Sequence, residues 1–100
     1  MKRTKSYQDY LIKSLKDPDE AAEYLNAALQ DGDSQIFLLA LRNVAQALGG
    51  LSRIAKKTKL NRASLYRMLS KKGNPELYSL GSLLKVLGLK LAVEVEKHAA

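Results

Sequence analysis

The segment "LSRIAKKTKLNRASLYRML", residues 51–69, decides the fold. Two short stretches with apolar residues at helical spacing, residues 51–57 and 61–70, are separated by only a few residues. This arrangement is typical of a helix–turn–helix unit, in which a second helix crosses the first at close range. Ala55 is the small residue at the expected crossing, and Leu60 is the apolar anchor that the turn requires. The segment therefore predicts a helix–turn–helix pair.

The second helix of this pair has two chemically different faces. At about 100° per residue, its apolar side chains fall on one face and its basic and aromatic side chains on the opposite face. An arginine guanidinium can donate two hydrogen bonds to guanine, an alanine can contact a thymine methyl, and a tyrosine can bind a phosphate. The core face comprises Leu65, Met68 and Leu69, and the reading positions are Arg62, Ala63, Tyr66 and Arg67.

The charge around this unit has one sign. Residues 1–33 carry a net charge of −2 and residues 34–100 a net charge of +9, with no acidic residue between Ser34 and Pro75. Such a field attracts polyanions, whereas an ordinary solvated surface mixes both signs. The pattern favours double-stranded DNA as partner. The predicted DNA-binding residues are Ser52, Arg53, Lys56, Lys57, Asn61, Arg62, Ala63, Ser64, Tyr66, Arg67, Lys71 and Lys72.

One residue departs from the motif. Lys59 occupies the turn position where a helix–turn–helix usually has glycine. If that residue has a positive φ, a lysine there costs on the order of 1 kcal/mol. Either the turn has a different shape or the strain is tolerated.

The acidic N-terminal third predicts a well-capped helix, preceded by a possible short helix near residues 7–15. Asp17 can cap the longer helix, Pro18 fits its first position, Glu20 completes a capping box, and Gly32 ends it. Its carboxylates suit the positive end of the helix dipole.

The next predicted helix begins at a cap, Asp33 or Ser34, and ends before Gly49. It is apolar almost all round from Ile36 to Leu41, so it is expected to be the central core helix, buried on more than one side.

The C-terminal region predicts a short helix that ends at Gly88, followed by an alternating segment, residues 89–96. Alternation with leucine and valine on one side is typical of a β-strand. A single strand on a helical domain needs a partner strand, supplied either by a second copy of the chain or by another protein.

These elements predict an all-α fold: a five-helix-type helix–turn–helix domain with an N-terminal helical extension and a short C-terminal β-strand. Residues 1–33 form the extension, and residues 34–100 form the DNA-binding domain with the strand as candidate dimerisation element.

Three longer pieces extend the pattern to most of the chain. They read "DPDEAAEYLNAAL", "FLLALRNVAQALGGLSRIAKKTKLNRASLYRMLS" and "GNPELYSLGSLLKVLGLKLAV". From about Tyr10 to Val95 the chain resembles the addiction-module antidote proteins, a HigA-like branch of the Xre/Cro-type helix–turn–helix family. The resemblance implies an antitoxin of a type II toxin–antitoxin module. Such a protein neutralises a RelE/HigB-like toxin by binding it, and represses its own operon as a homodimer on operator DNA.

The same resemblance makes residues 61–70 the recognition helix. It gives no individual residues for the toxin contact. The acidic residues 1–33 are a candidate surface for a basic, RNA-directed toxin because their charge is complementary.

An enzyme is poorly supported. The single histidine, His98, lies in the C-terminal tail, and the carboxylates near Asp17 are explained by helix capping. The sequence has no cysteine, no phosphate-binding glycine loop and no metal-ligand spacing, so no catalytic residue, metal or cofactor is predicted. No apolar run is long enough to span a bilayer and no secretory signal is seen, which suggests a cytoplasmic protein without a membrane partner.

Two other functions remain open. The chain is alternatively a phage-type transcriptional repressor without a toxin partner, because its DNA-binding half would look the same. It is otherwise an interaction protein whose basic face binds a protein or RNA. Binding to DNA upstream of its own gene, and the presence of a toxin gene beside it, would separate the three.

Overall fold

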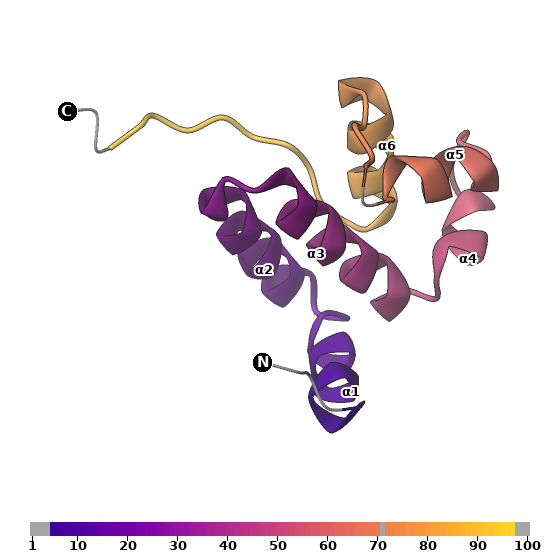
Figure 1. The fold of residues 1–100 in the computed structure, drawn as a ribbon, viewed down its shortest axis with the longest axis horizontal. Coiled ribbons are helices and arrows are strands. Elements are labelled where there is room, and N and C mark those ends of the chain that lie inside the picture. Colours follow the sequence, from indigo (N-terminus) through magenta and orange to yellow (C-terminus); the bar gives the residue numbers. More distant parts are fainter. Residues whose placement is uncertain (1–4, 71, 98–100) are drawn as a thin grey trace.

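The computed structural model describes residues 5–70 and 72–97, and this part of the chain contains six helices and no strand (Figure 1). The helical class agrees with the sequence-based prediction. The helices are α1 (Lys5–Ser14), α2 (Pro18–Asp31), α3 (Ser34–Ala47), α4 (Leu51–Ala55), α5 (Arg62–Met68) and α6 (Leu77–Val86).

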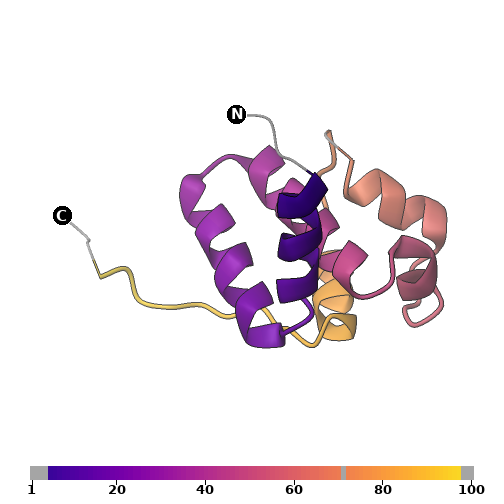
Figure 2. The ribbon, with the colours of Figure 1, turned by 90° about the horizontal axis from the view of Figure 1, so that it is seen from below.

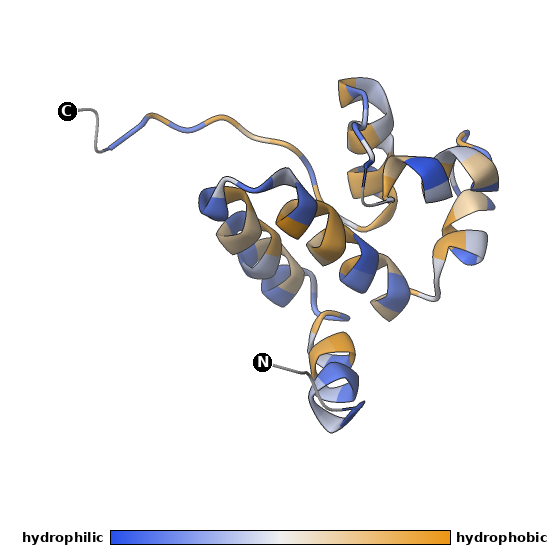
Figure 3. Ribbon diagram, in the orientation of Figure 1, coloured by the Kyte–Doolittle hydropathy of each residue, from blue (hydrophilic) through white to orange (hydrophobic). Residues whose placement is uncertain are grey.

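The predicted C-terminal β-strand is wrong. The N–H of Leu89 donates a hydrogen bond to the carbonyl oxygen of Leu84, at 2.8 Å. Residues 90–96 have no regular structure, and the end of this segment extends beyond the helices (Figure 1). Hydrophobic and hydrophilic residues do alternate along this segment (Figure 3). A β-strand, however, also requires a neighbouring strand with which its backbone N–H and C=O groups form hydrogen bonds. The regular elements of the described residues are all helices and offer no such strand. The alternation therefore produces an extended segment with Val93 and Val95 exposed.

Local capping explains where α2 begins and ends. The Asp17 carboxylate accepts a hydrogen bond from the N–H of Asp19, at 2.9 Å, and Gly32 ends the helix with a φ of 83°. In the expected capping box, the side chain of Glu20 would accept a hydrogen bond from the backbone N–H of Asp17. That N–H instead donates to the carbonyl oxygen of Ser14, at 3.2 Å. That bond links the end of α1 directly to the start of α2.

Helix α3 lies at the centre of the molecule and contacts α1, α2 and α4 (Figure 2). Its cap is Asp33, which accepts a hydrogen bond from the N–H of Gln35 at 2.8 Å. Leu38 and Leu41 are fully buried in the main hydrophobic cluster, whereas Leu39 remains partly exposed. The expectation of a central core helix is therefore confirmed, although one side of its first two turns is exposed to solvent.

A chain of polar side chains joins the first three helices inside this core. Asn43 of α3 is only 5% exposed. Its Nδ2 donates to Oη of Tyr24 on α2 at 2.8 Å, and its Oδ1 accepts from Nε2 of Gln8 on α1 at 3.1 Å. Because a buried amide is costly unless it is hydrogen-bonded, these contacts fix how α1 and α2 sit on α3. The two N-terminal helices thus share one core with the remainder of the described chain.

Candidate nucleic-acid interface

Helices α4 and α5 pack against each other in the order that the sequence predicts. Ile54 of α4 belongs to the main buried cluster, as do Leu65, Met68 and Leu69 at α5. The division of the second helix into a buried face and an exposed face is therefore confirmed.

The turn between α4 and α5 avoids the strain expected at Lys59. No residue other than glycine has a positive φ in the described part of the chain, so Lys59 does not adopt the conformation that glycine has in this motif. The turn instead closes around Thr58, whose hydroxyl accepts a hydrogen bond from the N–H of Leu60 and donates to its carbonyl, both at 3.1 Å. Leu60 packs against the core as expected of an anchor.

Helix α5 begins sharply at Arg62. Asn61 precedes it as N-cap, and its side chain accepts a hydrogen bond from the N–H of Ser64 at 2.7 Å. The helix ends at Met68, with Leu69 as C-cap, and is therefore shorter than the predicted span of 61–70.

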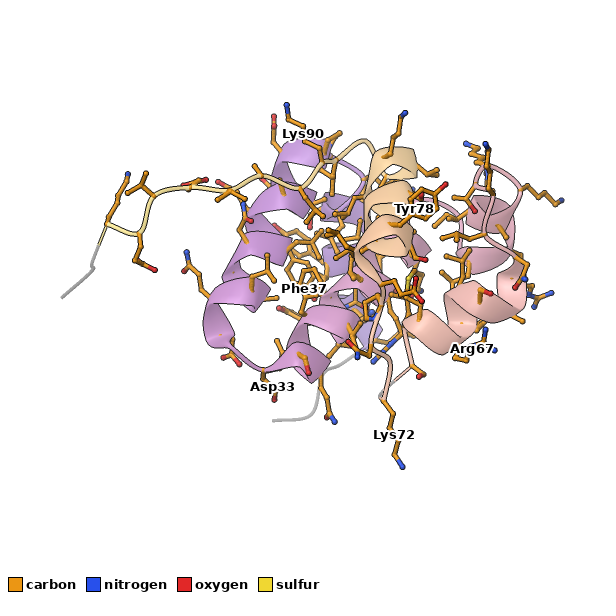
Figure 4. The ribbon with its side chains drawn as sticks, turned by 90° about the horizontal axis from the view of Figure 1, so that it is seen from above. Asp33, Phe37, Arg67, Lys72, Tyr78 and Lys90 are labelled. Atoms are coloured by element: carbon orange, nitrogen blue, oxygen red, sulfur yellow. The ribbon has the colours of Figure 1, made fainter. Side chains whose placement is uncertain are left out.

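The exposed face of α5 carries the four residues predicted to read bases. The Arg62 guanidinium lies over the ring of Tyr66, 5.3 Å from its centroid, which is cation–π geometry. On the other side of the face, Nη2 of Arg67 lies 3.5 Å from Oγ of Ser64. Arg67 projects into solvent beyond α5 (Figure 4). Ala63 is exposed between these groups and leaves space for close approach of a ligand.

Helix α5 forms a ridge between two grooves. A groove of about 460 Å³ borders Tyr66 and is also lined by Gln46, Gly50 and Leu51. A second groove, of about 470 Å³, borders Arg67 and is also lined by Ser64, Lys72, Asn74 and Glu76. A projecting helix with depressions on both sides has the shape that inserts into a DNA major groove while the flanks approach the phosphates.

Arg42 of α3 contacts the C-terminal end of α5. Its guanidinium donates a hydrogen bond from Nη1 to the carbonyl oxygen of Leu69, the C-cap of α5. A cation is favourable at this end of a helix because the last carbonyls carry partial negative charge. The sequence pattern predicts no such role for Arg42, which lies in the segment without acidic residues between Ser34 and Pro75. The available signal was its position directly after the apolar run from Ile36 to Leu41.

The other predicted DNA-binding residues are not all on the same side as α5. Ser52, Lys56 and Lys72 are exposed, and Lys72 projects from the molecule near Arg67 (Figure 4). Arg53 and Lys57 are also exposed, but they line a separate pocket of about 680 Å³ together with Ile12 of α1 and Val86 of α6. Lys71, also predicted, lies outside the described residues, as does His98.

Within residues 5–70 and 72–97, no group of three or more histidine, cysteine or carboxylate side chains is placed to hold a metal ion. In the same part of the chain, no helix has both the length and the apolar composition needed to cross a membrane.

Comparison with known proteins identifies the family. The chain is 31% identical over 97 residues to an uncharacterized protein of Haemophilus influenzae, an alignment that covers 96% of this chain and 99% of that protein. No solved structure gives a significant match. A family model described as "Probable addiction module antidote protein" matches residues 6–95, which is nearly the whole chain. The chain therefore belongs to this family of probable addiction module antidote proteins.

Proposed function

We propose that this protein is the antitoxin of a type II toxin–antitoxin module, of the HigA-like, Xre/Cro-type class. It neutralises a RelE/HigB-like toxin by direct binding and represses its own operon by sequence-specific DNA binding. Membership of the antidote family supports the antitoxin role and a non-enzymatic, regulatory activity.

The ridge formed by α5 is the observation that carries DNA binding. Arg62, Tyr66 and Arg67 are exposed on it while its opposite face is buried, and no acidic residue lies in the sequence between Ser34 and Pro75. The cation–π contact with Tyr66 limits the freedom of Arg62, so less entropy is lost when its guanidinium binds a base edge. Ser52, Lys56 and Lys72 are assigned to phosphates, which position the protein without reading sequence.

A gel-shift assay with DNA from upstream of the protein's own gene tests this assignment. Each of Arg62→Ala and Arg67→Ala is expected to weaken specific binding by about 1–3 kcal/mol, or roughly 5- to 150-fold. Lys13→Ala on α1 is the matched control, because it removes one exposed positive charge away from α5 and should change affinity little. Wild-type affinity in both arginine variants at low salt would refute the recognition-helix assignment.

The toxin-binding surface is assigned to α2, the acidic helix of the N-terminal region. Asp19, Glu20 and Glu23 of α2 are all exposed, so their charge is available to a basic, RNA-directed partner. Deleting residues 1–32 is a poor test, because α1 and α2 contribute Leu11 and Leu25 to the shared core. Surface charge reversal avoids that difficulty.

The double variant Glu20→Lys, Glu23→Lys is therefore expected to reduce rescue of cells that express the toxin, with DNA binding retained. Gln30→Lys, at an exposed site further along α2, adds positive charge without removing a carboxylate and serves as control. Full rescue by the double variant would place the toxin contact elsewhere. If the neighbouring reading frame encodes no toxin, the phage-type repressor without a toxin partner is the better description.

Repressors of this type bind pseudo-palindromic operators as dimers, with recognition helices about one DNA turn, roughly 34 Å, apart. We therefore assign a homodimer as the DNA-bound form, working in the cytoplasm where its operon is transcribed.

A further inference from the structure

Several strongly exposed apolar side chains of the described residues lie on α6 and on the segment that follows it. Leu77 and Tyr78 of α6 are 75% and 69% exposed, and Val93 is 99% exposed. Leu77, Tyr78, Leu91 and Val93 line one open groove of about 640 Å³, and exposed Val95 follows two residues later. These five residues are called the α6–tail surface.

The α6–tail surface is too large to be an ordinary scatter of apolar residues. Side chains of these sizes present on the order of 100 Å² each, so the five together expose several hundred Å². The largest apolar patch on a typical monomer is about 300–600 Å² and is often an interaction site. A standard interface buries about 800 Å² on each partner, with its apolar part at the centre. The α6–tail surface matches the centre of such an interface.

We infer that the α6–tail surface is the contact between two copies of this chain, formed by side-chain packing around a two-fold axis. A two-fold interface must be complementary to itself. Each copy offers both a groove and, in Val93, an apolar side chain that projects freely from the edge of that groove. The side chain of one copy can therefore enter the groove of the other.

The charges on and beside this surface point to the same partner. Lys85 lines the groove, and Lys90 and Glu94 lie in the segment beside it. With both signs present, a two-fold arrangement can bring a lysine of one copy against a carboxylate of the other. DNA is disfavoured by the apolar side chains and by Glu94. A basic toxin is better matched by the acidic face of α2.

This inference deepens the proposed homodimer. It is tested without DNA and without toxin, by sedimentation equilibrium of the purified full-length protein over a range of concentrations. If the interface is wrong, the DNA-reading role of α5 still stands on the gel-shift result. If the gel shift fails, the interface still stands on the sedimentation result.

The variant Leu77→Lys, Val93→Lys is expected to raise the dimer dissociation constant by about 10- to 100-fold, because each aliphatic side chain that the dimer would bury is replaced by a charge. Tyr10→Lys is the matched control. Tyr10 is 72% exposed on α1, as accessible as Tyr78, and its replacement should leave the dimer unchanged. Circular dichroism should show native helicity in all three proteins, since every altered residue is exposed.

The absence of cysteine from the chain allows an independent test. Under mild oxidation, Val93→Cys and Tyr78→Cys are expected to form disulfide-linked dimers much faster than Tyr10→Cys. Three results would overturn the inference. They are a wild-type protein that is monomeric at all concentrations, a double lysine variant that dimerises with unchanged affinity, and a double variant that loses toxin binding while its self-association is preserved. The last would assign the surface to the toxin.

Discussion

Replacing Tyr24 with phenylalanine should destabilise the protein through a residue on a different helix. The phenol of Tyr24 accepts the hydrogen bond from Nδ2 of Asn43, at 2.8 Å, inside the core. Tyr24→Phe keeps the ring and removes only the oxygen atom, so it leaves the amide of Asn43 without that acceptor. Asn43 is 5% exposed, which gives water little access to the orphaned N–H.

The magnitude follows from the cost of an unsatisfied buried donor, about 1–3 kcal/mol. Tyr24 itself is only half-buried, so partial hydration from its side places the expected loss in the lower half of that range, about 1–2 kcal/mol. In a chain of this size, 1 kcal/mol lowers the thermal midpoint by roughly 4–8 °C. The substitution is thus expected to be easily measurable.

Urea denaturation followed by far-UV circular dichroism measures this loss directly. The midpoint should fall while the slope stays unchanged, because the amount of surface exposed on unfolding is almost the same. Tyr10→Phe removes a hydroxyl from an exposed tyrosine and should change stability by less than about 0.5 kcal/mol. A double-mutant cycle of Tyr24→Phe with Asn43→Ala should give a coupling energy of at least about 0.5 kcal/mol. Equal stability of wild type and Tyr24→Phe, or strict additivity in the cycle, would refute the network as a source of stability.

Three further predictions concern α5 and its supports. Asn61→Ala removes the N-cap and should lower stability by about 0.5–2 kcal/mol, whereas Asn61→Ser should restore most of it in the same urea assay. Arg42→Met removes the hydrogen bond from the guanidinium to the carbonyl oxygen of Leu69. Relative to wild type, the amide hydrogen-exchange rates should then increase more at the end of α5 than in α3, and equal increases in the two helices would contradict this. Gly73→Ala should be strongly destabilising in thermal melts, because a Cβ there would lie 2.1 Å from the carbonyl oxygen of Met68; an unchanged midpoint would show that the backbone relaxes freely.

The parts of the fold that follow from short-range chemistry were predictable. Asp17, Asp33 and Asn61 cap the helices that they precede, and Gly32 ends α2 as expected. Each of these features depends on a side chain and on backbone groups only two or three residues away. The buried face of α5 was predictable for the same reason, since helical periodicity alone fixes which residues share a face.

Features that depend on distant partners were not predictable in this way. The alternation in residues 89–96 reports which side chains lie on the same side, but it contains no information about a neighbouring strand. The role of Arg42 depends on Leu69, 27 residues away in sequence. For the candidate interface, the sequence indicated the exposed residues of α5, but not that Arg53 and Lys57 line a separate pocket with residues of other helices.

Arg42 and Asn43 are consecutive residues, and at about 100° per residue they leave α3 in different directions. One is bonded to the end of α5, and the other to α1 and α2. A rotation of α3 about its own axis would therefore stretch the hydrogen bond to the end of α5 and those to α1 and α2 at the same time. The orientation of α3 thus affects both ends of the molecule. If α2 binds the toxin as proposed, a toxin that favoured one orientation of α3 would also favour the matching orientation of α5. By thermodynamic reciprocity, DNA on α5 would then change the affinity for that toxin by the same factor.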